Sequence, residues 1–173
     1  TTTGEAYSMT KAQTLSRLLM DPITTPPIVI LKDLEDNEAR SIWIGLLEAS
    51  AIVVEMEKIH LPRPMTHDLV ATILNSLEIQ VSRVEITDYR DNTYFALIHL
   101  LLDEKSFHID TRPSDAIAIA LRTQSPIYVH EKVIAESQQV DSETIGNSAE
   151  QSEQEGWEDV LENMSPEDFK YKM

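Results

Sequence analysis

The stretch at residues 83–110, RVEITDYRDNTYFALIHLLLDEKSFHID, constrains the possible folds of this chain more than any other. It is rich in β-branched and aromatic residues, and turn-forming residues interrupt it at 91–92 (Asp-Asn) and at 103–105 (Asp-Glu-Lys). This pattern predicts three antiparallel strands joined by two short turns. We therefore expect a largely antiparallel sheet at the centre of the fold.

The second turn sets the register of the last two strands. A loop of two or four residues there pairs Leu102 with Phe107, and hence His99 with Asp110. Because side chains alternate between the faces of a sheet, one face is then wholly apolar, with Ile98, Leu100, Leu102, Phe107 and Ile109. The other face mixes apolar and polar residues: Leu97, His99, Leu101, His108 and Asp110. Its two histidines and Asp110 are side chains of the types that bind metal ions, so this face is a candidate metal site. The motifs H-x-H and H-E-x-x-H are absent, which favours a plain polar face or interface.

Strands and helices alternate through the rest of the chain. We expect strands at 26–32, 40–45 and 126–130, and helices at 46–58, at 66–78, within 110–122 and from 131 onward. The helix at 66–78 has the clearest signals, since Thr66 is a natural N-cap. Its apolar stripe consists of Leu69, Ile73 and Leu77, widened by Val70 and Leu74.

These elements predict an α+β fold, with a mixed, largely antiparallel sheet, two or three packed helices and a flexible acidic C-terminal tail. We divide the chain into an N-terminal extension (1–15), an α+β domain (16–137), an acidic disordered linker (138–156) and a short amphipathic segment (157–173). The last segment carries Trp157, Val160, Leu161 and Met164 at helical spacing. We expect it to dock on its own domain or on a sister subunit, rather than on a separate partner.

The charge of the chain limits its partners. The formal net charge is −16, and residues 28–134 alone hold 17 acids and 10 bases. A protein that grips phosphate backbones usually presents a basic face, whereas this chain has no cluster of Lys and Arg. The acidic composition therefore argues against tight nucleic-acid binding, although a local arginine pocket is compatible with this composition.

Three features that the sequence lacks bear on the cellular location of the protein. The chain has no cysteine, which excludes disulfides and thiolate metal sites. It has no apolar run near the ~18 residues of a membrane span. It also has no charged-then-apolar leader. We expect a cytoplasmic protein without a membrane partner.

The stretch DTRPSDAIAIALR, at 110–122, places charged residues around a run of six apolar residues. A helix that is apolar on every side is buried, so its polar ends need partners. Ser114 is a good N-cap, while Asp115 and Arg122 complement the helix dipole at the two ends. Helix capping alone therefore accounts for part of this charge.

Two interpretations of the remaining residues stay open. In the structural one, Arg112 simply pairs with Asp110, Asp115 or Glu48. In the functional one, Asp110 and Asp115 bind a cation or activate water, and Arg112 holds a phosphate.

The segment RPMTHDL adds His67 as a candidate general acid or base, although a histidine in a first helical turn is often only a capping or surface residue. Its neighbour Asp68 lies on a different helix face and cannot orient it. A partner must come from Glu48, Asp110 or Asp115.

Other chemistries lack support. The sequence has no G-x-G-x-x-G, G-K-[ST] or G-x-S-x-G motif and only four glycines. Aromatic residues make up 6% of the chain and show no stacking pattern for single-stranded nucleic acid.

Five motifs, in order, resemble the bifunctional nuclease domain family: PIVILKD, IWIGLLEASAI, RPMTHDLV, DYRDNTYFALIHL and DTRPSDAIAIALRTQSPIYV. The resemblance spans residues 18–136. It implies an α+β fold, nuclease activity on DNA and RNA, and homo-oligomers, and plant relatives are credited with defence signalling. It implicates Glu48, Arg63, His67, Asp68, Asp110, Arg112, Ser114, Asp115 and Arg122.

The leading hypothesis is a nuclease, assisted by a cation such as Mg²⁺ or Mn²⁺. The expected catalytic residues are His67, Asp68, Asp110 and Asp115; the expected substrate-binding residues are Arg63, Arg112, Ser114 and Arg122; the expected metal ligands are Glu48, Asp110 and Asp115. The alternative is a non-catalytic binding or regulatory module, whose cluster of arginine and carboxylates is structural or binds a small anion.

Overall fold

A computed structural model describes residues 10–21, 25–35 and 38–136 of the 173-residue chain. The predictions for the acidic linker (138–156) and for the amphipathic segment (157–173), including its docking, lie outside these residues.

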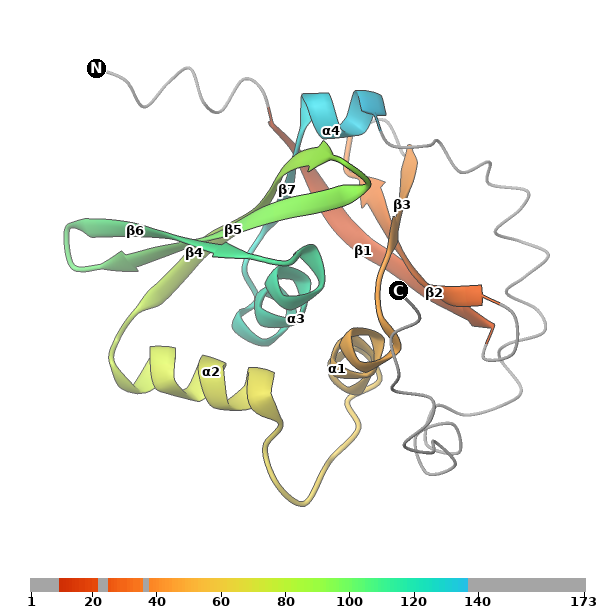
Figure 1. Ribbon diagram of the computed structural model, residues 1–173. Helices are drawn as coiled ribbons and strands as arrows, with labels where there is room; N and C mark the ends of the chain where they lie inside the picture. Colours follow the sequence, from red (N-terminus) through yellow and green to blue (C-terminus); the bar gives the residue numbers. More distant parts are fainter. Residues whose placement is uncertain (1–9, 22–24, 36–37, 137–173) are drawn as a thin grey trace.

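The described residues form one mixed seven-stranded sheet with four helices, which confirms the α+β prediction (Figure 1). The strands are β1 (Thr10–Asp21), β2 (Thr25–Asp33), β3 (Ala39–Trp43), β4 (Gln80–Arg90), β5 (Thr93–Leu102), β6 (Lys105–Thr111) and β7 (Ile127–His130), in the spatial order β3-β2-β1-β7-β4-β5-β6. The helices are α1 (Leu46–Met56), α2 (Thr66–Ser76), α3 (Pro113–Thr123) and α4 (Glu131–Glu136). Strands β4 and β7 pair in parallel, and the other five neighbouring pairs are antiparallel. In the described part of the chain, no helix is long and apolar enough to span a membrane.

Strand β1 lies inside the sheet, between β2 and β7. It begins at Thr10, so residues 10–15, which the sequence assigned to an N-terminal extension, belong to the sheet. The sequence did not indicate this strand because polar residues occupy buried positions in it. Gln13 is 5% exposed, and its Nε2 donates to Asp33 Oδ2 at 3.0 Å.

The predicted meander is confirmed as β4, β5 and β6, but the register of its second hairpin was wrong. The turn contains two residues, Asp103 and Glu104, and Leu102 pairs with Lys105. His99 therefore lies opposite His108, and Asp110 lies opposite Leu97. Because the observed register differs from the predicted one by two residues, an even number, each side chain stays on its predicted face of the sheet. Asp110, however, moves away from His99.

The core lies between the sheet and helices α1 and α3, which cover one face side by side (Figure 1). The residues from Ala116 to Ala120 of α3 are all at most 2% exposed, which confirms the predicted buried helix. They pack with residues such as Ile52 of α1 and Val84 and Ile86 of β4. The first turns of both helices, which begin at the edge of this core, carry the polar residues described below.

Helix α2 is peripheral and differs from its prediction. Its N-cap is Met65, one residue before Thr66, and none of its eleven residues is buried. Leu74 packs partly against the core, whereas Leu69, Ile73 and Leu77 are 53%, 48% and 59% exposed. The spacing of the apolar stripe was read correctly, but most of the stripe faces away from the domain.

Candidate functional site

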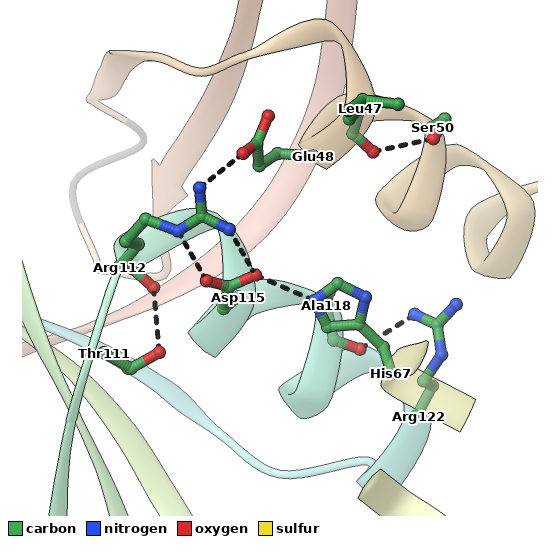
Figure 2. Close-up of polar contacts among 9 residues, drawn as sticks. All are labelled: Leu47, Glu48, Ser50, His67, Thr111, Arg112, Asp115, Ala118 and Arg122. Carbon is green, nitrogen blue, oxygen red and sulfur yellow. Dashed lines mark hydrogen bonds and ion pairs between the residues drawn. The ribbon is translucent and has the colours of Figure 1, made fainter. Parts of the chain in front are cut away.

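Four charged or polar side chains converge where the first turns of α1, α2 and α3 meet (Figure 2). Glu48 comes from α1, His67 from α2, and Arg112 and Asp115 from the start of α3. We call these four residues the polar cluster. Three separate segments of the chain contribute to it, and the family resemblance implicated all four residues.

Arg112 bridges the two carboxylates of the polar cluster. Its Nε and Nη2 donate to the two oxygens of Asp115 at 2.7 and 3.2 Å, and its Nη1 donates to Glu48 Oε1. The hydrogen bond with Asp115, more than any other contact, raises the pKa of Arg112. The Arg112 side chain is nevertheless 59% exposed, whereas that of Glu48 is 10% exposed. The guanidinium therefore covers the carboxylates and faces solvent itself.

Asp115 is also the partner of His67, as one of the three sequence alternatives anticipated. His67 Nε2 lies 2.8 Å from Asp115 Oδ1. The hydrogen bond with His67, followed by that with Arg112, lowers the pKa of Asp115 to about 2 against the effect of burial. An ionised carboxylate can only accept, so Nε2 of His67 carries the hydrogen in this contact. In the neutral ring, Nδ1 is then the nitrogen that can accept a proton.

The lowered pKa makes the folded state sensitive to acid. A depressed carboxyl pKa contributes stability above the unfolded value of 3.8, and this contribution disappears as the pH falls towards 2. We expect the Asp115 contribution to fall by about 1 kcal/mol between pH 5 and pH 3. Urea unfolding of the native chain and of Asp115→Asn across this range measures it, because the difference in unfolding free energy should shrink as the pH falls. A difference that stays constant would contradict the assigned ion pair.

Asp68 and Arg122 form a second ion pair, which ties α2 to α3. Arg122 Nε donates to Asp68 Oδ1 at 2.6 Å and Nη1 donates to the Ala118 carbonyl at 3.0 Å. Asp68 Oδ2 also accepts the backbone N–H of Met65 at 2.7 Å. Burial raises the pKa of Asp68, but the hydrogen bonds from Arg122 and Met65 outweigh it and lower the pKa overall. The Arg122 side chain is 4% exposed, so this pair is structural in its geometry.

Three other predicted residues lie apart from the polar cluster or have a different local role. Arg63 is exposed in the loop before α2, and Asp110 is exposed on the edge strand β6; within the described residues, neither side chain forms a hydrogen bond or ion pair. Ser114 is 6% exposed and sits inside the first turn of α3, because Arg112 is the N-cap and Pro113 the first helical residue. The N-cap prediction for Ser114 was therefore wrong by two positions.

The predicted metal ligands do not come together. Within the described ranges, no three or more histidine, aspartate or glutamate side chains are arranged to hold a metal ion. Asp110 is exposed on the edge strand β6, and the Arg112 cation bridges Glu48 and Asp115. The donors present therefore do not fit a three-carboxylate site for Mg²⁺ or Mn²⁺.

The two sheet histidines form a separate arrangement on the other face of the sheet. The rings of His99 and His108 have centroids 4.6 Å apart, and His99 Nε2 lies 3.1 Å from Glu85 Oε2. Burial, and then the charge of Arg83, lowers the pKa of His99. His99 is thus a packed residue of the sheet, 7% exposed, and not part of a metal site within the described residues.

A pocket of about 700 Å³ lies beyond the Asp68–Arg122 pair, and it was not predicted from the sequence. The end of α2, the connection to β4 and the segment from α3 to β7 line it. Its lining includes Thr72, Asn75, Glu78 and Thr123 besides Arg122. Of the candidate site residues that the sequence singled out, Arg122 alone lines this pocket.

Comparisons with known proteins agree with the sequence motifs. The family model described as the bifunctional nuclease domain matches residues 29–142. An uncharacterized protein of Mycobacterium tuberculosis is 34% identical over 148 residues, which cover 83% of this chain and 88% of that protein. Bifunctional nuclease 2 of Arabidopsis thaliana is 30% identical over 114 residues, and bifunctional nuclease 1 of Oryza sativa subsp. japonica is 27% identical over 115 residues. Each plant match covers 35% of the plant protein, so the similarity concerns one part of those longer chains.

Proposed function

Because this chain belongs to the bifunctional nuclease domain family, we propose that it is a nuclease that hydrolyses phosphodiester bonds of DNA, RNA or both. The names of the plant relatives support the reaction class. The single observation that carries the proposal is the contact between His67 and Asp115 beside an exposed arginine. An oriented histidine next to a guanidinium is a suitable arrangement for attack on a phosphodiester.

In this proposal, His67 moves the proton. Its Nδ1 accepts a proton from water as the water oxygen bonds to phosphorus, and the bond from phosphorus to the leaving sugar oxygen breaks. The imidazolium then gives the proton to that leaving oxygen. Asp115 fixes the ring by accepting from Nε2 and stabilises the transient positive charge.

Arg112 is the proposed phosphate contact. Its side chain is 59% exposed, and a guanidinium matches two phosphate oxygens well. Its charge is already offset by Glu48 and Asp115, so a phosphate has to compete with these carboxylates. We therefore expect weak substrate binding that depends strongly on salt.

The remaining family positions take supporting roles in the proposal. Asp68, Ser114 and Arg122 position the first turns of α2 and α3, since their contacts are internal to the domain. Arg63 and Asp110 are exposed and free to meet a substrate. Because the donor set does not fit a metal ion, no step of the proposal passes through one. We also propose that the protein is cytoplasmic, and the absence of cysteine is in line with that location. Self-association is a further proposal, which follows from the family.

A non-catalytic binding or regulatory module is the second candidate. The observation in its favour is the charge balance: the polar cluster pairs one arginine with two carboxylates, in a chain of net charge −16. Such a cluster serves equally well as a structural network.

Incubation of the purified full chain with labelled single- and double-stranded DNA and RNA separates the two candidates. We expect fragments from at least one substrate class, and faster cleavage at low salt because of the weak phosphate contact. Reactions with EDTA and with added Mg²⁺ or Mn²⁺ establish whether a metal contributes. Intact substrates under all these conditions would contradict the nuclease proposal and leave the binding module.

A further inference from the structure

The pocket beyond the Asp68–Arg122 pair has no role in the proposed chemistry. Its volume of about 700 Å³ is within the usual range of small-molecule sites, ~300–1,000 Å³. Thr72, Asn75 and Gln124 line it and are exposed, so the pocket opens to solvent. A small molecule, or one unit of a longer one, can therefore enter it.

Three side-chain amides in the lining are available to a ligand. Within the described residues, the side chains of Asn75, Gln80 and Gln124 form no hydrogen bond or ion pair. Each amide carries two N–H donors and one carbonyl acceptor. The hydroxyls of Thr72 and Ser82 donate to backbone carbonyls at 2.8 and 3.1 Å, so they offer only their lone pairs. The lining thus presents more donors and acceptors than the domain itself uses.

Arg122 brings an unpaired donor to the same lining. Its Nε and Nη1 donate to Asp68 and to the Ala118 carbonyl (Figure 2), whereas its buried Nη2 has no hydrogen-bond partner in the described part of the chain. A buried donor without a partner is costly, so a ligand that offers an acceptor is favoured. The charge of Arg122 is matched by Asp68, and the other charged residue of the lining is Glu78. The pocket therefore favours a neutral ligand over an anion.

The rest of the lining is largely aliphatic, with Ala71, Leu74, Ile79, Val81 and Pro126. Aliphatic surface beside unpaired amides suits a flat, neutral ring with donors and acceptors along its edge. The faces of such a ring contact apolar side chains, and its edge forms hydrogen bonds with the amides. A nucleobase has these properties, and the amides of asparagine and glutamine pair with the edge of adenine through two hydrogen bonds.

We propose that this pocket binds a nucleobase. Helix α2 connects it to the polar cluster: His67 lies in the first turn, and Asn75 lies further along the helix, about 12 Å away along the axis. A strand whose phosphate lies at the polar cluster can span that distance with a few nucleotides. The inference rests on the proposed nuclease function, since it takes the base from the substrate strand. Arg112 contacts only phosphate in that proposal, so the pocket is the part that can read sequence.

Titration with free nucleosides tests the pocket without cleavage, because a nucleoside has no phosphodiester bond. We expect adenosine, guanosine, cytidine or uridine to shift the side-chain amide NMR signals of Asn75, Gln80 and Gln124 in the native full chain. Ribose and inorganic phosphate are the ligand controls and should leave these signals in place. No shift with any of the four nucleosides overturns the proposal, and so do equal shifts with ribose or phosphate.

Gln124→Gly and Asn75→Ala remove amides without damage to the fold. Gln124 has a φ of 54°, which glycine adopts freely, and Asn75 is exposed in a helix, where alanine is favoured. Each variant should weaken nucleoside binding by about 3- to 10-fold, the loss of one or two hydrogen bonds. Lys58→Gly, at a φ of 53°, and Ser76→Ala, in the same helix, are matched controls outside the lining and should bind as the native chain does. Native affinity in both lining variants overturns the proposal.

The cleavage pattern on a single-stranded oligonucleotide separates this inference from the proposed function. We expect the native chain to prefer one base at a fixed distance from the cut, and Gln124→Gly to lose that preference. Nucleoside binding without any cleavage would contradict the nuclease proposal alone. Cleavage whose base preference is the same in Gln124→Gly and the native chain overturns the base pocket alone.

Discussion

Replacement of His67 by alanine is expected to lower the rate of phosphodiester cleavage by about 100- to 10,000-fold, the usual contribution of a positioned acid–base group. The reason is geometric: Asp115 holds the Nε2 side of the ring at 2.8 Å, so Nδ1 is the nitrogen left to move the proton. Initial rates on the best substrate, measured against pH, give the effect.

His60→Ala is the matched control, because His60 is exposed in the loop before α2 and lies outside the polar cluster. It should retain the native rate. Asp115→Asn should lose activity as well, since an amide can present the wrong hydrogen-bonding group to Nε2. Equal rates for His67→Ala and the native chain, with both folded by circular dichroism, would remove His67 from the proposed chemistry.

The fold was predictable where local chemistry agrees with tertiary packing. The meander is read from its turn residues, and α3 from its apolar run, because both patterns are local. Strand β1 was missed because Gln13, a polar residue, is buried against Asp33, and only the tertiary contact explains it. The hairpin register was missed by two residues because a two-residue turn at Asp103 and Glu104 uses Lys105 as the first residue of the strand.

The site was predictable as a set of residues but not as a geometry. The sequence offered Asp115 as one of three partners for His67, and the packing of α2 on α3 selects it. Asp110 was expected in the metal set, yet it is exposed on the edge strand β6. The direction of the apolar stripe of α2 was equally unpredictable, because helical spacing identifies the stripe and says nothing about which side of the helix meets the domain.

Arg122→Ala is expected to be strongly destabilising, more so than the replacement of an exposed charged residue. It removes one partner of an ion pair in which the arginine side chain is 4% exposed, and it leaves Asp68 without its main cation. Loss of one member of a buried pair costs about 3–5 kcal/mol, and we expect about 2–4 kcal/mol here because Asp68 is 31% exposed. Urea unfolding measures the change in free energy of unfolding.

The region that Arg122→Ala destabilises distinguishes the Asp68–Arg122 pair from an ordinary surface ion pair. Arg122 also donates to the Ala118 carbonyl, so its loss weakens both the end of α3 and the attachment of α2. Hydrogen exchange should therefore accelerate across α2 in Arg122→Ala, while the core strands change less. Arg90→Ala is the matched control: Arg90 is 64% exposed and 3.8 Å from Asp88, so its removal should cost less than about 1 kcal/mol. If both variants lost the same stability, Asp68 and Arg122 would not anchor α2, and the placement of His67 against Asp115 would need another support.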